Sequence, residues 1–219
     1  MRINVKGTIV SDDEKWIYDW FGIEATSPRS ITQAIAEAKK TGEQIDVYIN
    51  SGGGSVFAGS EIYAAIREYS GAAKIHIVGL AASAASVIAC AAKSEMSPTA
   101  QIMVHNVSSS MDGDYHDMDK MSEILQKANE TIAAAYVAKT GMDKQTALDL
   151  MDRETWLSAE DALKLGLVDE ISSNKNNMQL VASINCNVIP QAIINKMTAE
   201  RAQAKHDAQI KLNKLKGGY

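Results

Sequence analysis

The chain has 219 residues, enough for one α/β domain with a sizeable core, or for one domain and a tail. Its formal net charge of -5 gives no electrostatic support for nucleic acid or an anionic membrane surface as a partner. No apolar stretch is long enough to span a membrane, and the first residues lack the apolar core of a signal peptide. The two cysteines, Cys90 and Cys186, have no metal-ligand spacing around them, so we expect a cytoplasmic protein without metal or cofactor.

The first part of the chain predicts two strands separated by a helix. Ile3–Val10 has the alternation of an edge strand, and residues 29–40 have the apolar spacing of a helix with one buried face. A second strand, Ile45–Ile49, leads into the glycine-rich stretch 50–55. That stretch lacks the residues of a P-loop and the spacing of a dinucleotide fingerprint. It is therefore either a plain turn or a place where backbone N–H groups point at an oxyanion.

The next segment is a strand, a turn of small residues and a helix. The strand is Ile75–Val78, the turn spans residues 79–86, and it contains Ser83. A serine at this place is either an ordinary helix N-cap or a nucleophile beside unpaired backbone N–H groups, where developing negative charge is favoured.

Three candidate residues lie at the ends of predicted strands. Gly54 and Ser83 follow the second and third strands, and His105 ends the next apolar run, Gln101–His105. Strands that alternate with helices imply right-handed crossovers and a mostly parallel sheet. Because ligands bind at the carboxyl ends of such strands, we expect these three residues to share one site.

The second half of the chain is predicted to be mainly helical. A long amphipathic helix over residues 116–139 either projects and packs against another chain or packs inside the core. Ser158 begins a further helix with a capping box, and Leu167 and Val168 are expected to begin a last short strand. The polar linker at residues 173–177 suggests a core over residues 1–172 and a helical tail over residues 173–219.

The parts of a serine hydrolase are all available among these residues. Such an enzyme needs a nucleophile, a base, an orienting acid and oxyanion donors. Ser83 is the candidate nucleophile and His105 the candidate base, whereas His76 lies inside a strand and is interpreted as structural. Asp152 and Glu154 are both available as the acid, and nothing in the local sequence chooses between them.

Four blocks of the sequence resemble the signatures of the ClpP family, the proteolytic subunit of the Clp protease. In family order, over roughly residues 45–171, they are Asn50–Gly54, Gly79–Ser83, Met103–His105 and Trp156–Asp169. The resemblance implies an α/β, ClpP/crotonase-like fold of repeated β-β-α units with a projecting handle helix. It also implies a serine endopeptidase that works through an acyl-enzyme, with residues 1–172 as the protease domain.

Carried over by position, the resemblance gives each candidate a role. Ser83 matches the nucleophile, His105 the base and Glu154 the acid, with Asp152 as the alternative that the local sequence leaves open. The corresponding oxyanion donors are the backbone N–H groups of Gly54 and Ala84, and the substrate would lie as an added strand along Gly52, Gly53 and Ser55. The helix at 116–139 matches the handle that joins two rings, which implies a homo-oligomeric ring, either a heptamer or a double ring.

Several departures from the family pattern bear on the role. Glu154 is one methylene longer than the usual Asp, Gly52 stands where the family usually has Pro, and the chain has an additional tail. The short N-terminus lacks the segment that forms axial loops, which argues against a Clp ATPase as partner. These features resemble the ClpP-related proteases of phages and prophages, so we expect ATP-independent capsid maturation, with capsid proteins as partners, or Clp-type protein degradation.

Two alternatives come from other functional classes. A crotonase-like acyl-CoA enzyme shares the fold class and an amide oxyanion hole, but it uses no nucleophilic serine. A non-catalytic capsid or scaffold component would keep the fold without activity. A Ser–Lys mechanism using Lys93 is weaker, because ten residues of helix would separate Lys93 from Ser83 by about 15 Å.

Overall fold

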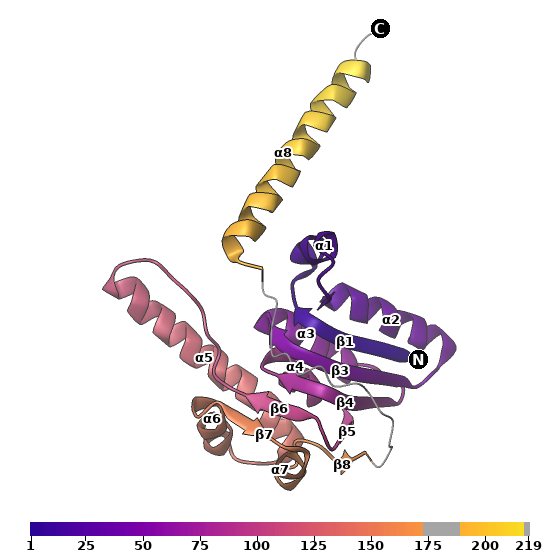
Figure 1. The fold of residues 1–219 in the computed structure, drawn as a ribbon, viewed down its shortest axis with the longest axis vertical. Coiled ribbons are helices and arrows are strands. Elements are labelled where there is room, and N and C mark those ends of the chain that lie inside the picture. Colours follow the sequence, from indigo (N-terminus) through magenta and orange to yellow (C-terminus); the bar gives the residue numbers. More distant parts are fainter. Residues whose placement is uncertain (173–188, 217–219) are drawn as a thin grey trace.

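The computed structural model describes residues 1–172 and 189–216, and it is built around a mostly parallel sheet (Figure 1). The described strands are β1 (Arg2–Ile9), β2 (Ala25–Thr26), β3 (Ile45–Gly54), β4 (Ala73–Ala82), β5 (Lys93–Met96), β6 (Gln101–Val104), β7 (Thr155–Leu157) and β8 (Glu170–Ile171). Their order is β2-β1-β3-β4-β5-β8, and β6 pairs with the second half of β4 and with β7. Among the described strands only the β6–β7 pair is antiparallel. The expected α/β class with a mostly parallel sheet is confirmed.

Some of the helices lie against one face of this sheet, and the two longest extend away from the body in different directions (Figure 1). The helices are α1 (Asp12–Trp20), α2 (Pro28–Thr41), α3 (Val56–Arg67), α4 (Ala84–Ala89), α5 (Tyr115–Thr140), α6 (Lys144–Asp152), α7 (Ala159–Lys164) and α8 (Gln191–Lys216). The helices predicted over residues 29–40 and 116–139 correspond to α2 and α5. No described helix is both long and apolar enough to cross a membrane.

The alternation of apolar and polar residues decides which face of the sheet is covered. Ile45, Val47 and Ile49 of β3 are fully buried and belong to one core cluster with residues of α2 and α3. Burying an isoleucine side chain contributes about 1.5–3 kcal/mol, so this face holds the helices in place. The opposite face is polar: His76 stacks on Tyr48 with ring centroids 4.4 Å apart, as its structural interpretation implied.

Three strand predictions are corrected by the sheet. Ile3–Val10 was expected at an edge, but β1 lies between β2 and β3. The glycine run was expected to follow a strand, but β3 continues through it, because β1 runs alongside as far as the Ile9–Gly54 pair. The last strand was expected to begin at Leu167, yet pairing begins only at Glu170, since the N–H of Leu167 is still bonded to the carbonyl of Ala162 in the preceding turn.

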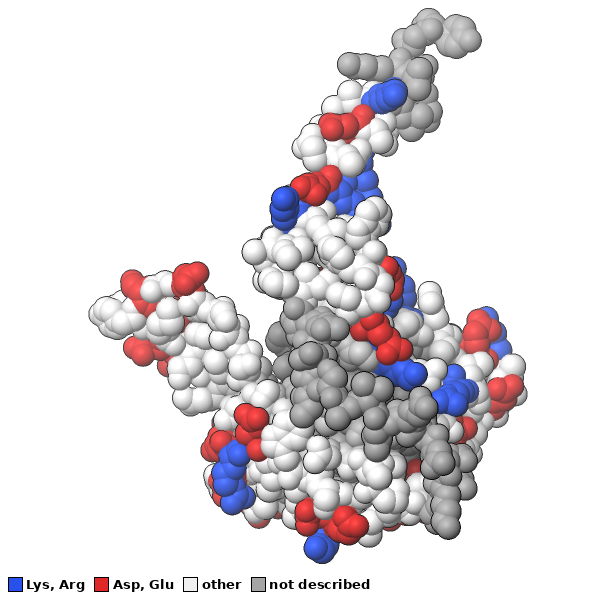
Figure 2. Space-filling model, in the orientation of Figure 1, with Lys and Arg blue, Asp and Glu red and all other residues white. Residues whose placement is uncertain are grey.

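Helix α5 is half core helix and half projection. Its inner end is buried at Ile132 and Tyr136, whereas the outer turns leave the body (Figure 1). Acidic side chains gather at the outer end on the face shown in Figure 2. Met118, Met121 and Leu125 instead line a groove of about 640 Å³ between α5 and the segment that follows His105. Of the two alternatives expected for this helix, core packing describes the inner half and projection describes the outer half. Packing of the outer half against another chain stays a prediction.

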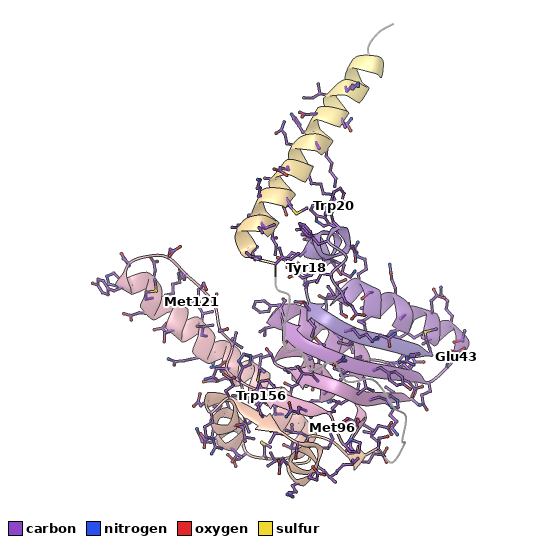
Figure 3. The ribbon with its side chains drawn as sticks, viewed as in Figure 1. Tyr18, Trp20, Glu43, Met96, Met121 and Trp156 are labelled. Carbon is purple, nitrogen blue, oxygen red and sulfur yellow. The ribbon has the colours of Figure 1, made fainter. Side chains whose placement is uncertain are left out.

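The C-terminal helix α8 contacts α1. Ile189 and Ile194 form a small apolar cluster with Ile17 and Tyr18, and the guanidinium of Arg201 lies 4.4 Å from the ring centroid of Trp16. Figure 3 shows Tyr18 on α1 close to the start of α8. The predicted linker at residues 173–177 lies outside the described residues.

Candidate active site

Two parallel strands bring Ser83 and His105 into contact. Ala82 at the end of β4 pairs with Met103 of β6, so the residues that follow these two strand ends lie side by side. The Nε2 atom of His105 is 2.8 Å from the Oγ atom of Ser83, a hydrogen-bond distance, and both side chains are partly exposed. A hydroxyl bonded to a partly exposed imidazole is the arrangement that activates a serine nucleophile.

Ser83 has a strained backbone conformation. Its φ of 55° and ψ of -126° lie outside the regions that L-residues prefer, and among the described non-glycine residues only Glu154 also has a positive φ. Such a conformation costs about 1–3 kcal/mol. Ser83 occupies the N-cap position of α4, but its side chain makes no capping hydrogen bond, so helix capping does not explain this serine. The strained turn instead leaves Oγ available to His105.

Several hydrogen bonds maintain this turn. The N–H of Ser83 donates to the carbonyl of Met103 at 2.9 Å. The carbonyl of Ser83 accepts from the N–H of Ser86 at 2.9 Å and from its Oγ at 2.6 Å. The Ser86 hydroxyl is in turn 2.8 Å from the hydroxyl of Tyr136 on α5.

The glycine end of β3 packs directly against the Ser83 turn. Gly53 has a φ of 93°, and a Cβ atom there would lie only 2.7 Å from both the Ala82 carbonyl oxygen and the Ser83 Cβ. The same Cβ would lie 3.0 Å from the backbone nitrogen of Ala84. Only glycine lets the two backbone segments come this close.

Two candidate N–H donors lie at this contact. Ser55 donates its N–H to the carbonyl of Ile9 at 2.8 Å. In a regular strand successive N–H groups point to opposite edges, and here the N–H that faces β1 is that of Ser55, the residue next to Gly54. Ala84 is the first residue of α4, where backbone N–H groups have no partner within the helix. The Ser55 side chain accepts from the N–H of Ala58 at 3.3 Å and caps α3.

Neither candidate acid is bonded to His105. Asp152 accepts a hydrogen bond at 2.6 Å from the amide nitrogen of Asn106. Glu154 accepts at 3.4 Å from the indole nitrogen of Trp156, which Figure 3 labels on β7. Among the described residues, Ser83 makes the one side-chain hydrogen bond to the imidazole of His105. The structure thus joins the nucleophile and base candidates but leaves both carboxylates on other partners.

Comparison with known proteins agrees with this architecture. The family model for Clp protease matches residues 23–175. The chain belongs to the Clp protease family. It is 32% identical over 168 residues to the ATP-dependent Clp protease proteolytic subunit 1 of Chlamydia trachomatis, covering 72% of this chain and 88% of that protein. The same values hold for the subunit of Chlamydia muridarum.

The solved structures agree on the fold. A mutant of ClpP1 from Listeria monocytogenes superposes with a TM-score of 0.66 at 22% identity, covering 80% of this chain and 92% of that one. The fold is therefore that of ClpP, as the sequence blocks implied. As a member of this family, the chain is a ClpP-like serine peptidase.

Sequence reasoning missed three residues that support the site. Ser51 donates to the carbonyl of Gly7 at 2.6 Å and accepts from the N–H of Gly53 at 3.1 Å, which fixes the glycine turn. Ser86 and Tyr136 support the Ser83 carbonyl. Ser51 and Ser86 lie close to the glycine and Ser83 motifs in sequence, but no local signal points to Tyr136.

Proposed function

We propose that this ClpP-like peptidase cleaves peptide bonds with Ser83 as nucleophile and His105 as general base. The observation that carries the proposal is the 2.8 Å contact between His105 Nε2 and Ser83 Oγ. His105 takes the proton of Ser83 as Oγ attacks the peptide carbonyl, and returns a proton to the leaving amine. Water, activated by the same imidazole, then hydrolyses the acyl-enzyme.

We propose the backbone N–H groups of Gly54 and Ala84 as the oxyanion hole. Support comes from the close approach of the β3 glycine end to the start of α4, and from the bond that the next N–H along the chain, that of Ser55, makes to the Ile9 carbonyl of β1. We also propose that the substrate lies as an added strand along Gly52, Gly53 and Ser55. Because the N–H groups of Gly53 and Ser55 already donate to Ser51 Oγ and to the Ile9 carbonyl, such a strand would pair through other backbone groups of this stretch.

For the acid we propose Glu154, with Asp152 as the alternative. The left-handed backbone of Glu154, φ 47°, is a strained conformation of the kind that clusters at active sites. Among the described residues, the one hydrogen bond of its longer side chain is the 3.4 Å contact with Trp156, whereas Asp152 has a short bond to Asn106. Turning the Glu154 side chain toward Nδ1 of His105 therefore breaks a weaker hydrogen bond than turning the Asp152 side chain would.

A pair of isosteric variants distinguishes the two acids. Glu154→Gln keeps the shape and removes the charge that stabilises the imidazolium, so kcat should fall by about 10²–10⁴. Asp152→Asn should leave kcat within about threefold. The reverse pattern would assign the acid to Asp152.

We propose a homo-oligomeric ring, a heptamer or a double ring, assembled through α5. The apolar residues of the outer half of α5, Met118, Met121 and Leu125, line an open groove within a single chain, and a second copy would cover them. We also propose that residues 1–172 form the protease domain and residues 173–219 a separate tail.

For the biological role we propose ATP-independent proteolysis in the cytoplasm, of the type found in phage and prophage capsid maturation, with capsid proteins as partners. Support comes from Gly52 in place of the usual Pro and from the additional C-terminal helix. Clp-type protein degradation is the second candidate. Addition of a purified Clp ATPase with ATP separates the two, because only the second role predicts faster cleavage of a folded protein.

Fluorophosphonate labelling with peptide mass mapping tests the catalytic proposal. We expect covalent labelling at Ser83, lost in Ser83→Ala and strongly reduced in His105→Ala. A folded oligomer that is not labelled would contradict the proposal and favour the non-catalytic scaffold. Retention on an acyl-CoA resin without labelling would favour the crotonase-like alternative.

A further inference from the structure

Two buried hydroxyls outside the catalytic pair connect α5 to the backbone of Ser83. Ser86 and Tyr136 are only 1% and 3% exposed, and their hydroxyl oxygens are 2.8 Å apart. Ser86 lies one helical turn after Ser83, whereas Tyr136 lies 50 residues further along the chain, on the buried end of α5.

The directions of these hydrogen bonds follow from counting protons. The carbonyl oxygen of Ser83 can only accept, so the 2.6 Å contact requires the single hydroxyl proton of Ser86. Ser86 must then accept from Tyr136, which is the donor at the head of the chain. Burial raises the pKa of the Tyr136 phenol, so this donor keeps its proton throughout the working pH range.

This chain of hydrogen bonds ends at Ser83, the strained residue of the active site. The Ser83 carbonyl is held by the N–H and the hydroxyl of Ser86 while φ stays at 55°. Because both bonds hold the carbonyl of Ser83, they limit rotation about its Cα–C bond, which would otherwise move Oγ relative to His105. Burying a hydroxyl costs free energy unless it is hydrogen-bonded. If these two positions served packing alone, Ala in place of Ser86 and Phe in place of Tyr136 would avoid that cost.

We propose that Tyr136 and Ser86 are positioning residues for the nucleophile, which hold the backbone of Ser83 in its reactive conformation through the chain Tyr136 to Ser86 to Ser83. The inference rests on the proposed role of Ser83. It predicts that loss of either hydroxyl slows attack by Ser83 without weakening substrate binding.

The test uses Tyr136→Phe, Ser86→Ala and the double variant in the full chain. A net hydrogen bond is worth about a factor of 3 to 10, so Ser86→Ala should lower kcat and the fluorophosphonate rate about tenfold, and Tyr136→Phe about threefold. KM should stay unchanged. Because Tyr136 acts through Ser86, the double variant should match Ser86→Ala alone.

Tyr69→Phe is the matched control. Tyr69 is also buried, and its hydroxyl donates to the carbonyl of Glu43. Glu43 lies at the end of the sheet away from Trp156 (Figure 3), so this variant should lower the melting temperature but not kcat. Two results would overturn the proposal when the wild type is labelled at Ser83. One is a kcat equal to that of the wild type in both Tyr136→Phe and Ser86→Ala. The other is a double variant whose loss of kcat equals the product of the two single losses. If the wild type is not labelled at Ser83, the proposed function fails and this inference fails with it.

Discussion

The substitution Gly53→Ala tests the contact between β3 and the Ser83 turn. The new methyl would lie 2.7 Å from the Ala82 carbonyl oxygen and from Ser83 Cβ, whereas ordinary van der Waals contact begins at 3.4 Å. The backbone must therefore separate by about 0.7 Å. Neither opposing atom belongs to a flexible side chain that could turn away, so the glycine strand or the Ser83 turn has to move.

That displacement is large compared with the tolerance of an oxyanion hole. A donor at about 2.9 Å from the oxyanion would move to about 3.6 Å, beyond hydrogen-bond range. Loss of one donor lowers turnover by about 10²–10³, and we expect a loss of this size in kcat for Gly53→Ala. A peptide substrate assay, with the rate of fluorophosphonate labelling measured in parallel, gives the value.

Gly42→Ala separates the effect on the site from backbone strain. Gly42 also has a positive φ, 69°, but a Cβ atom added there would meet nothing within 4 Å. Both variants should lose about 1–2 kcal/mol of stability from the left-handed backbone. Only Gly53→Ala should lose turnover. A kcat within threefold of wild type for Gly53→Ala would refute the argued role of this contact.

Three further predictions concern other parts of the molecule. Burial raises the pKa of Cys90 to about 12, so iodoacetamide at pH 8 should alkylate it about 10³-fold more slowly in the native protein than in urea, as peptide mapping would measure. Burial alone would raise the pKa of Asp169, but hydrogen bonds from Lys139 and Ser94 hold this pKa below its ordinary value of 3.8. Its contribution to stability is therefore complete above pH 3.8 and is lost as pH falls through the lower folded value, so urea unfolding should show Asp169→Asn destabilised at pH 7 and close to wild type at pH 2. Ile194→Asp should release α8 from α1 and speed tryptic cleavage after Lys196, while the melting temperature of the core changes little.

The α/β class and the expectation that Ser83 and His105 share one edge of the sheet follow from the order of residues along the chain. Apolar runs of strand length, separated by helical patterns, require a parallel sheet, and such a sheet gathers the carboxyl ends of its strands at one edge. Which strand ends meet, however, depends on pairing: β5 lies between β4 and β6 in the chain, and Ser83 reaches His105 because β6 pairs with the second half of β4. Reasoning from the sequence also identified α5, because a long periodic helix that ends in glycine needs no tertiary information.

Other features depend on contacts between distant segments, and they became visible only once the chain was folded. The glycine run became part of β3 because β1 continues beside it to Ile9. Tyr136 reached the Ser83 turn because α5 packs its inner end under α4, a contact across 50 residues that no local pattern encodes. The carboxylates of Asp152 and Glu154 differ through their partners, Asn106 and Trp156, not through their own sequence positions. Local periodicity sets each element and its buried face, whereas the partners of a side chain follow from how the elements pack.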